Sequence, residues 1–195
     1  MTDVASSGGA QRPPKIKVGV LLGPEPAETG GWLADAAAFD AGGADALWVE
    51  LGPEPELDVL ALAAAVAAVT FRARLVVALP ASSVEGGGLR RTVDTIARLS
   101  HGRLALLGDP DRCAGLGVGI FRRVRGEPGA FEEEDAQRWV SVPVVQGRAA
   151  WRAACAAAAN HGAQGLVVPA DPRLLDMLRN PEEPGDRRDL QLAQG

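Results

Sequence analysis

Two acidic side chains stand where predicted buried strands end. Glu50 lies within the apolar stretch of residues 44–51, and Asp109 closes the stretch of residues 100–109. A carboxylate at a strand end can hydrogen-bond a ligand or tune a proton on a substrate. Glu50 can equally be a polar rim residue paired with an arginine, and Asp109, with Asp111, can be a turn former that bonds its own backbone. The order of strands and helices along the chain predicts that these strand ends meet on one rim of a parallel barrel.

Arginine is the second residue type that could bind a ligand. Arg122, Arg123 and Arg125 follow a glycine-rich segment, and guanidinium groups suit bidentate contact with phosphate. An acidic run at residues 132–135 follows closely, so the alternative is a solvated surface paired with acids. We take Arg122 as the candidate phosphate ligand.

The sequence offers no residue for the usual catalytic machinery. Its two histidines, His101 and His161, precede predicted strands and are expected at the opposite, amino-end face. Cys113 and Cys155 lack the spacing of a disulfide framework or a zinc site, and no nucleophile elbow or phosphate-binding loop occurs. The catalytic residues are therefore unknown, and we expect no metal.

Strands and helices alternate along the chain. Continuous apolar runs predict strands at 16–22, 44–51, 74–80 and 163–169, with weaker signals at 118–124 and 139–145. Helical spacing predicts helices at 30–41, 58–70, 89–99, 148–160 and 172–179, with Asp40 on the buried face of the first. Residues 126–134 resemble turn material.

Alternation of this kind predicts βαβ units and a parallel sheet. A complete eight-stranded α/β barrel usually needs about 250 residues, and this chain has 195. We therefore expect an α/β fold, a reduced, incomplete TIM-type βα barrel with parallel strands. Residues 15–180 would form the domain, residues 1–14 a disordered leader and residues 181–195 a loose tail.

Four segments resemble the luciferase-like monooxygenases, which use flavin or deazaflavin. They are the strand at 16–22, the phrase Ala-Gly-Gly-Ala-Asp-Ala-Leu-Trp-Val-Glu at 41–50, the run at 60–79, and Leu-Ser-His-Gly-Arg-Leu-Ala-Leu-Leu-Gly at 99–108. Residues 151–178 are similar to the last unit of that family. The resemblance implies that an internal block of the barrel is missing around residues 109–142.

The resemblance also implies a ligand. It predicts a flavin- or deazaflavin-dependent oxidoreductase of the monooxygenase type, with FMN or a deazaflavin coenzyme beside Glu50, Pro80, Ala81, Ser82, Asp109 and Arg122. The small residues after Pro80 would let a flavin ring approach, although an ordinary loop explains them as well. The family's histidine after the second strand is replaced by Leu51. This departure favours the alternative, a non-catalytic relative that binds a flavin or a partner and has reduced or lost activity.

Composition limits the partners. The formal net charge is -5 and the arginines are scattered among acids, which argues against nucleic acid. The longest apolar run is too short for a membrane span, and the first residues lack a secretory signal, so we expect a cytoplasmic protein. A shortened barrel would expose strand edges, so we also expect a homo-oligomer, with at least one of the four tryptophans at its interface.

Overall fold

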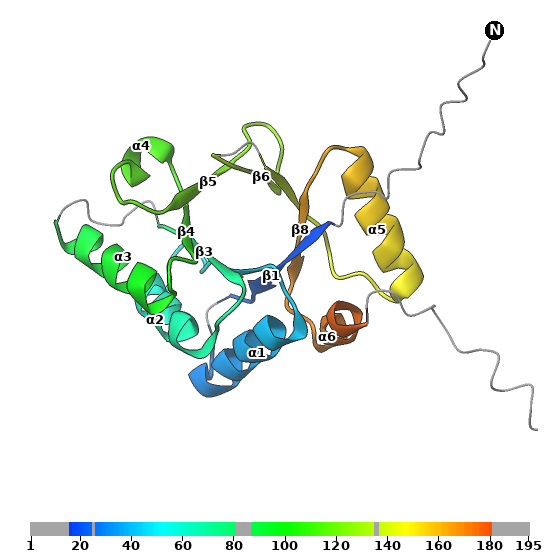
Figure 1. The fold of residues 1–195 in the computed structure, drawn as a ribbon, viewed down its shortest axis with the longest axis horizontal. Helices are drawn as coiled ribbons and strands as arrows, with labels where there is room; N and C mark the ends of the chain where they lie inside the picture. Colours follow the sequence, from blue (N-terminus) through cyan, green and yellow to red (C-terminus); the bar gives the residue numbers. More distant parts are fainter. Residues whose placement is uncertain (1–15, 25, 81–86, 135–136, 181–195) are drawn as a thin grey trace, which may run out of the picture.

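Eight strands form a closed barrel with helices around most of its circumference (Figure 1). The computed structural model describes residues 16–24, 26–80, 87–134 and 137–180. The strands are β1 (Lys17–Leu22), β2 (Ala46–Val49), β3 (Arg74–Ala78), β4 (Leu104–Leu107), β5 (Gly119–Arg123), β6 (Ala130–Glu133), β7 (Arg138–Ser141) and β8 (Gly165–Pro169). The helices are α1 (Thr29–Gly42), α2 (Val59–Val69), α3 (Gly87–Leu99), α4 (Pro110–Cys113), α5 (Arg148–Asn160) and α6 (Pro172–Arg179).

The expected incomplete, all-parallel TIM-type barrel is wrong in both respects. Strands β1 to β5 run parallel to one another, and β7 and β8 run parallel to β1. Between these two groups, β6 runs antiparallel to both β5 and β7. The ring is complete, because β1 pairs with β8 from Lys17 opposite Gly165 onward. The fold is a closed, mixed barrel.

The segment expected to be the site of a missing block supplies this closure. Residues 119–141 form β5, β6 and β7, and the segments between them, residues 124–129 and 134–137, are too short for helical crossovers. Gly126 and Gly129, in the turn between β5 and β6, have φ angles of 81° and 78°, which glycine adopts without steric cost. Two antiparallel connections need far fewer residues than two strand–helix units, so a short chain closes the ring. Closure also removes the open edge from which we expected self-association.

Aromatic side chains fill the inside of the barrel. Trp48, Phe121, Phe131 and Trp139 are at most 5% exposed, and the ring centroids of Trp48 and Phe131 lie 4.8 Å apart. Gly165 makes room for Trp139, because a Cβ on Gly165 would lie 2.3 Å from that indole. The tryptophans of β2 and β7 are therefore barrel core residues and do not lie at an outer interface.

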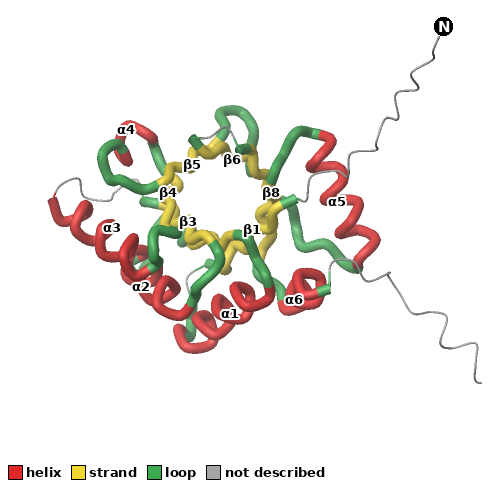
Figure 2. The backbone as a smooth tube through the Cα atoms, viewed as in Figure 1, coloured by secondary structure: helices red, strands yellow, loops and turns green. Residues whose placement is uncertain are grey.

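A second apolar core lies between the strands and the helices that surround them (Figure 2). Valines and leucines from the outward positions of β1 to β4 and β8 pack there against α1, α2, α3 and α6. Side chains on these strands thus alternate between the two cores, as a barrel requires. Helix ends match the sequence signals: Asp171 caps α6 ahead of Pro172, and Gly43 ends α1 with φ 98°.

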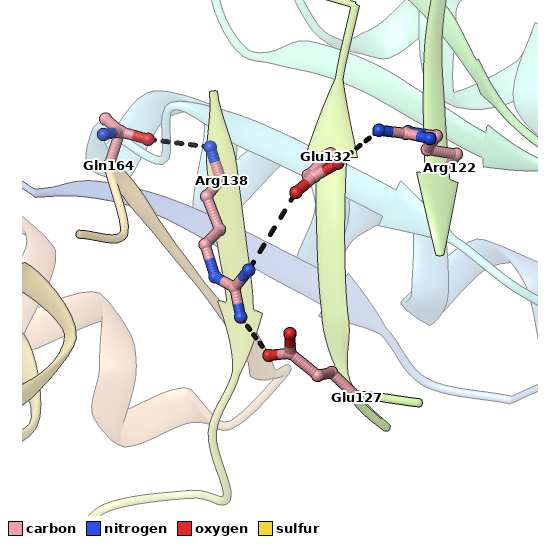
Figure 3. A network of polar contacts seen from close by, with 5 residues as sticks. All are labelled: Arg122, Glu127, Glu132, Arg138 and Gln164. Atoms are coloured by element: carbon pink, nitrogen blue, oxygen red, sulfur yellow. Dashed lines mark hydrogen bonds and ion pairs between the residues drawn. The ribbon is translucent and has the colours of Figure 1, made fainter. Parts of the chain in front are cut away.

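No described helix covers the outer side of β6 (Figures 1 and 2). Charged side chains face outward there, from residues that lie opposite one another in register: Arg122 on β5, Glu132 on β6 and Arg138 on β7. Arg122 Nη2 lies 2.6 Å from Glu132 Oε2, and Arg138 pairs with Glu127 (Figure 3). This outer wall ladder is compatible with water, so the wall needs no covering helix.

The leader, residues 1–14, and the tail, residues 181–195, lie outside the described residues. Within the described part of the chain, every helix is too short or too polar to cross a lipid bilayer.

Candidate functional site

A cleft of about 1070 Å³ lies at the carboxyl ends of β2 to β5. Its lining is Glu50, Leu51, Gly52, Pro53, Val59, Ala78, Leu79, Pro80, Leu107, Gly108, Asp109, Pro110, Arg112, Arg122 and Arg123. Four of the residues singled out from the sequence, Glu50, Pro80, Asp109 and Arg122, are in this set. The prediction that these strand ends meet on one rim is confirmed. Ala81 and Ser82 lie outside the described residues.

The cleft has walls of different chemistry. Leu51, Val59, Leu79 and Leu107 contribute to an apolar wall at the ends of β2 to β4, together with Pro53 and Pro80. Arg112 on α4 and Arg123 on β5 contribute basic side chains to the lining, and Glu50 and Asp109 contribute acidic ones. An arrangement of this kind suits a ligand with an apolar body and a negatively charged group.

Glu50 and Arg123 form an ion pair at the mouth of the barrel. Glu50 follows β2 two residues after Trp48, and Arg123 ends β5 two residues after Phe121, so both side chains belong to the inward set. The Arg123 guanidinium also lies over the Phe131 ring, 5.3 Å from its centroid. Glu50 is thus a rim residue paired with an arginine, the alternative considered from sequence, and its partner contacts the aromatic core.

Arg122 lies at the edge of the cleft, but its guanidinium points away from the cleft toward Glu132. Its guanidinium pairs with Glu132 in the outer wall ladder, and its side chain is 61% exposed. This is the acid-paired surface arrangement that the sequence left open. The neighbouring Arg123 is better placed to meet a ligand inside the cleft.

Asp109 organises the loop after β4. Its side chain accepts a hydrogen bond from the backbone N–H of Asp111 at 3.0 Å and caps the short helix α4. The turn-forming interpretation is therefore confirmed, and this carboxylate helps to hold α4, and with it Arg112, beside the cleft.

Sequence reasoning undervalued Arg123, although a signal for it was present. Phe121 is a buried aromatic residue, and period-two alternation places Arg123 on the same face of the strand. A separate sequence signal, which concerns the cleft and not Arg123, is the phrase Leu-Gly-Pro-Glu-Pro, which occurs at residues 22–26 and again at residues 51–55. The two copies stand at the ends of the adjacent strands β1 and β2, and the described residues of these copies that line the cleft are Leu51, Gly52 and Pro53.

The remaining nucleophilic and basic groups are poorly suited to catalysis in the cleft. Burial raises the pKa of the Cys113 thiol, which lies next to Gly108, so the thiol stays protonated at neutral pH. His101 and His161 precede β4 and β8 at the amino ends, as expected, and His161 Nδ1 lies 2.7 Å from the Ala157 carbonyl oxygen at the end of α5. Among the described residues, no three metal-ligating side chains come together.

A smaller hollow of about 390 Å³ lies at the amino-end face and contains Arg72, Arg74 and Arg103. Arg103 donates to the carbonyl oxygens of Thr70 and Ala73 at 2.6 and 2.5 Å, and burial lowers its pKa. Arg74 pairs with the buried Glu133. These two arginines stabilise the loops and the barrel floor, so the hollow is a weaker candidate than the cleft.

The fold and the cleft together define a mixed α/β barrel with a large rim cleft whose lining combines apolar and charged side chains. Comparison with known proteins adds no assignment, since neither a family model nor a curated protein matches the chain.

Proposed function

We propose that this protein binds a flavin, FMN or a deazaflavin coenzyme, in the cleft at the carboxyl ends of β2 to β5. The observation that carries the proposal is the convergence of Glu50, Pro80, Asp109 and Arg123 on one cleft of about 1070 Å³. Ligand pockets usually enclose about 300–1,000 Å³, so the space is sufficient for a molecule of this size.

The chemistry of the walls supports the same ligand class. An isoalloxazine ring is flat and largely apolar, which suits the wall that includes Leu51, Val59 and Leu107. Its phosphoribityl chain carries negative charge, which suits Arg112 and Arg123. The resemblance of residues 41–50 and 99–108 to luciferase-like sequences selects a flavin among molecules of this shape.

The cleft favours binding over catalysis by the protein itself. Glu50 is paired with Arg123, Asp109 is used in capping α4, and no histidine is among the described residues that line the cleft. A general base would need to be available within hydrogen-bond reach of its proton. We therefore place the non-catalytic flavin-binding role first.

Oxidoreductase activity is the second candidate, and one observation favours it. Hydride or oxygen transfer is chemistry that a flavin itself carries, so the protein need supply only position and a partly dry pocket. The apolar wall with Leu51, Val59 and Leu107 is suited to excluding water from one ring face.

A fluorescence titration tests the proposal. Purified protein is titrated into FMN, riboflavin and a deazaflavin, and quenching or a spectral shift of the flavin is followed. We expect saturable binding of at least one of them at micromolar concentration. Absence of binding to all three would contradict the proposal.

A second measurement separates the two candidates. The reoxidation rate of reduced FMN in air is compared with and without the protein, at saturating protein concentration. An unchanged rate supports the binding role, whereas a changed rate, with product formed from an added aldehyde or other acceptor, supports the oxidoreductase.

A further inference from the structure

The pair formed by Glu50 and Arg123 differs from the other arginine pairs of the barrel. The side chains of Glu50 and Arg123 are 34% and 54% exposed, and both residues line the cleft. Glu133, the partner of Arg74, is only 6% exposed and lies in the barrel floor. Arg122 holds its partner on the outer wall. Among the described ion pairs, the pair formed by Glu50 and Arg123 is therefore the one that a ligand in the cleft can reach with both partners.

Replacement of Glu50 by another anion as the partner of Arg123 costs little free energy. An ion pair in contact with water contributes little to stability, because solvent competes for both charges. The Arg123 guanidinium is also held by the face of Phe131, 5.3 Å from the ring centroid. It can therefore keep its place when Glu50 moves away.

A phosphate is a stronger partner for this guanidinium than the carboxylate of Glu50. A guanidinium forms two parallel hydrogen bonds with a phosphate, and a phosphate monoester carries more charge than one carboxylate. Arg112 is a second guanidinium in the lining of the cleft.

We propose that Arg123 is the anion-binding residue of the cleft and that a ligand phosphate displaces Glu50 from it. Glu50 then acts as an internal competitor that occupies Arg123 until an anionic ligand arrives. This inference rests on the proposed function for the identity of the ligand, and it makes the ligand class specific: a planar molecule with a phosphate group is preferred over its uncharged form.

The test compares FMN with riboflavin, which lacks the phosphate. Dissociation constants are measured for the wild type and for Arg123→Gln, Glu50→Gln and Arg138→Gln. Arg138 is the matched control, because it also pairs with a glutamate, in its case Glu132, but is not among the residues that line the cleft.

We expect the wild type to bind FMN about tenfold more tightly than riboflavin, corresponding to one charge-assisted contact. Arg123→Gln should remove this preference. Glu50→Gln should tighten FMN binding several-fold and leave riboflavin binding unchanged, and Arg138→Gln should leave both affinities unchanged. Arg123→Lys, which keeps the charge and loses the fork, should give an intermediate preference and replaces Arg123→Gln if that variant does not fold.

These measurements distinguish failure of the anion-binding role of Arg123 from failure of flavin binding in the cleft. Equal affinity for FMN and riboflavin in the wild type, or an FMN preference that survives Arg123→Gln, would overturn the role of Arg123 while flavin binding stands. If neither flavin binds, the melting temperature is measured with inorganic phosphate alone. A larger rise in the wild type than in Arg123→Gln would support the anion site, and equal rises would overturn it.

Discussion

At the residue scale, Asp40 shows how one buried side chain holds two distant segments together. It is 4% exposed on α1, and its carboxylate accepts hydrogen bonds from the backbone N–H groups of Phe71, Arg72 and Ala73 at 2.9, 3.0 and 2.6 Å. These three donors belong to the loop that enters β3, so Asp40 fixes the start of that strand.

Replacement of Asp40 by asparagine should therefore destabilise the fold. Asparagine offers one accepting oxygen and turns an NH₂ group toward an N–H donor, so a buried donor loses its partner. We expect the free energy of unfolding to fall by about 1–3 kcal/mol. Urea denaturation followed by circular dichroism measures it, with the exposed Asp35→Asn on the same helix as control. Equal stability of the two variants would contradict the assigned role of Asp40.

At the element scale, β6 determines how the ring closes, and its two glutamates face opposite sides. Glu132 belongs to the outer wall ladder and is 28% exposed, whereas Glu133 points inward to Arg74 and is 6% exposed. The Arg74 guanidinium lies in turn 5.3 Å from the centroid of the Phe121 ring. The inner pair thus joins β3 to β6 across the barrel floor.

The two glutamates should respond differently to the same substitution. Glu133→Gln removes the buried charged partner of Arg74, whose own side chain is 35% exposed, and should lower the free energy of unfolding by about 1–2 kcal/mol. Glu132→Gln breaks pairs that face solvent and should cost less than about 1 kcal/mol. Denaturant titrations of both proteins give the comparison. A larger loss for Glu132→Gln would mean that the register of β6 is shifted by one residue, so that Glu132 and not Glu133 faces the barrel interior.

The parallel strand–helix units were predictable because their signals are local. Buried strands such as residues 44–51 are continuous apolar runs, and helices show apolar spacing and caps such as Asp171. β6 was not predictable in this way, because residues 126–134 are rich in glycine and glutamate. Burial of Glu133 makes sense only once Arg74, 59 positions earlier, is known to be its partner.

The candidate site, like the fold, was predictable from the sequence only in part. Strand order was enough to place Glu50, Pro80 and Asp109 on one rim. The partners of the arginines were not predictable from strand order, because one of them lies on an antiparallel neighbour of β5 that the sequence did not reveal. The partner of Arg122 is on that neighbour, β6, and the inward position is left to Arg123.

At the scale of the whole molecule, closure of the barrel leaves no strand of the ring with a free edge. The backbone N–H groups of β1 are used by pairing with both β2 and β8. An incomplete barrel would instead leave its terminal strands unpaired on one side, which is the state that promotes self-association.

Hydrogen exchange distinguishes a closed barrel from an incomplete one in solution. In the closed barrel, amides of β1 and β8 should exchange about as slowly as those of β2 and β3, because all of them take part in the ladder and are buried. Exchange is followed by two-dimensional NMR or by mass spectrometry of peptic fragments. Rapid exchange throughout β1 or β6 would show that the ring is open in solution.

The central claim is that a flavin binds in the rim cleft, and two matched glycine substitutions test it most directly. Gly52 and Gly23 each precede a proline in the repeated phrase, and a Cβ at either would meet no atom within 4 Å, but only Gly52 lines the cleft. The measurement is the FMN dissociation constant of Gly52→Trp and Gly23→Trp. We predict that Gly52→Trp weakens binding at least about tenfold by filling the cleft, and that Gly23→Trp binds like the wild type. Equal affinities in the two variants, or loss of binding only in Gly23→Trp, would contradict the account.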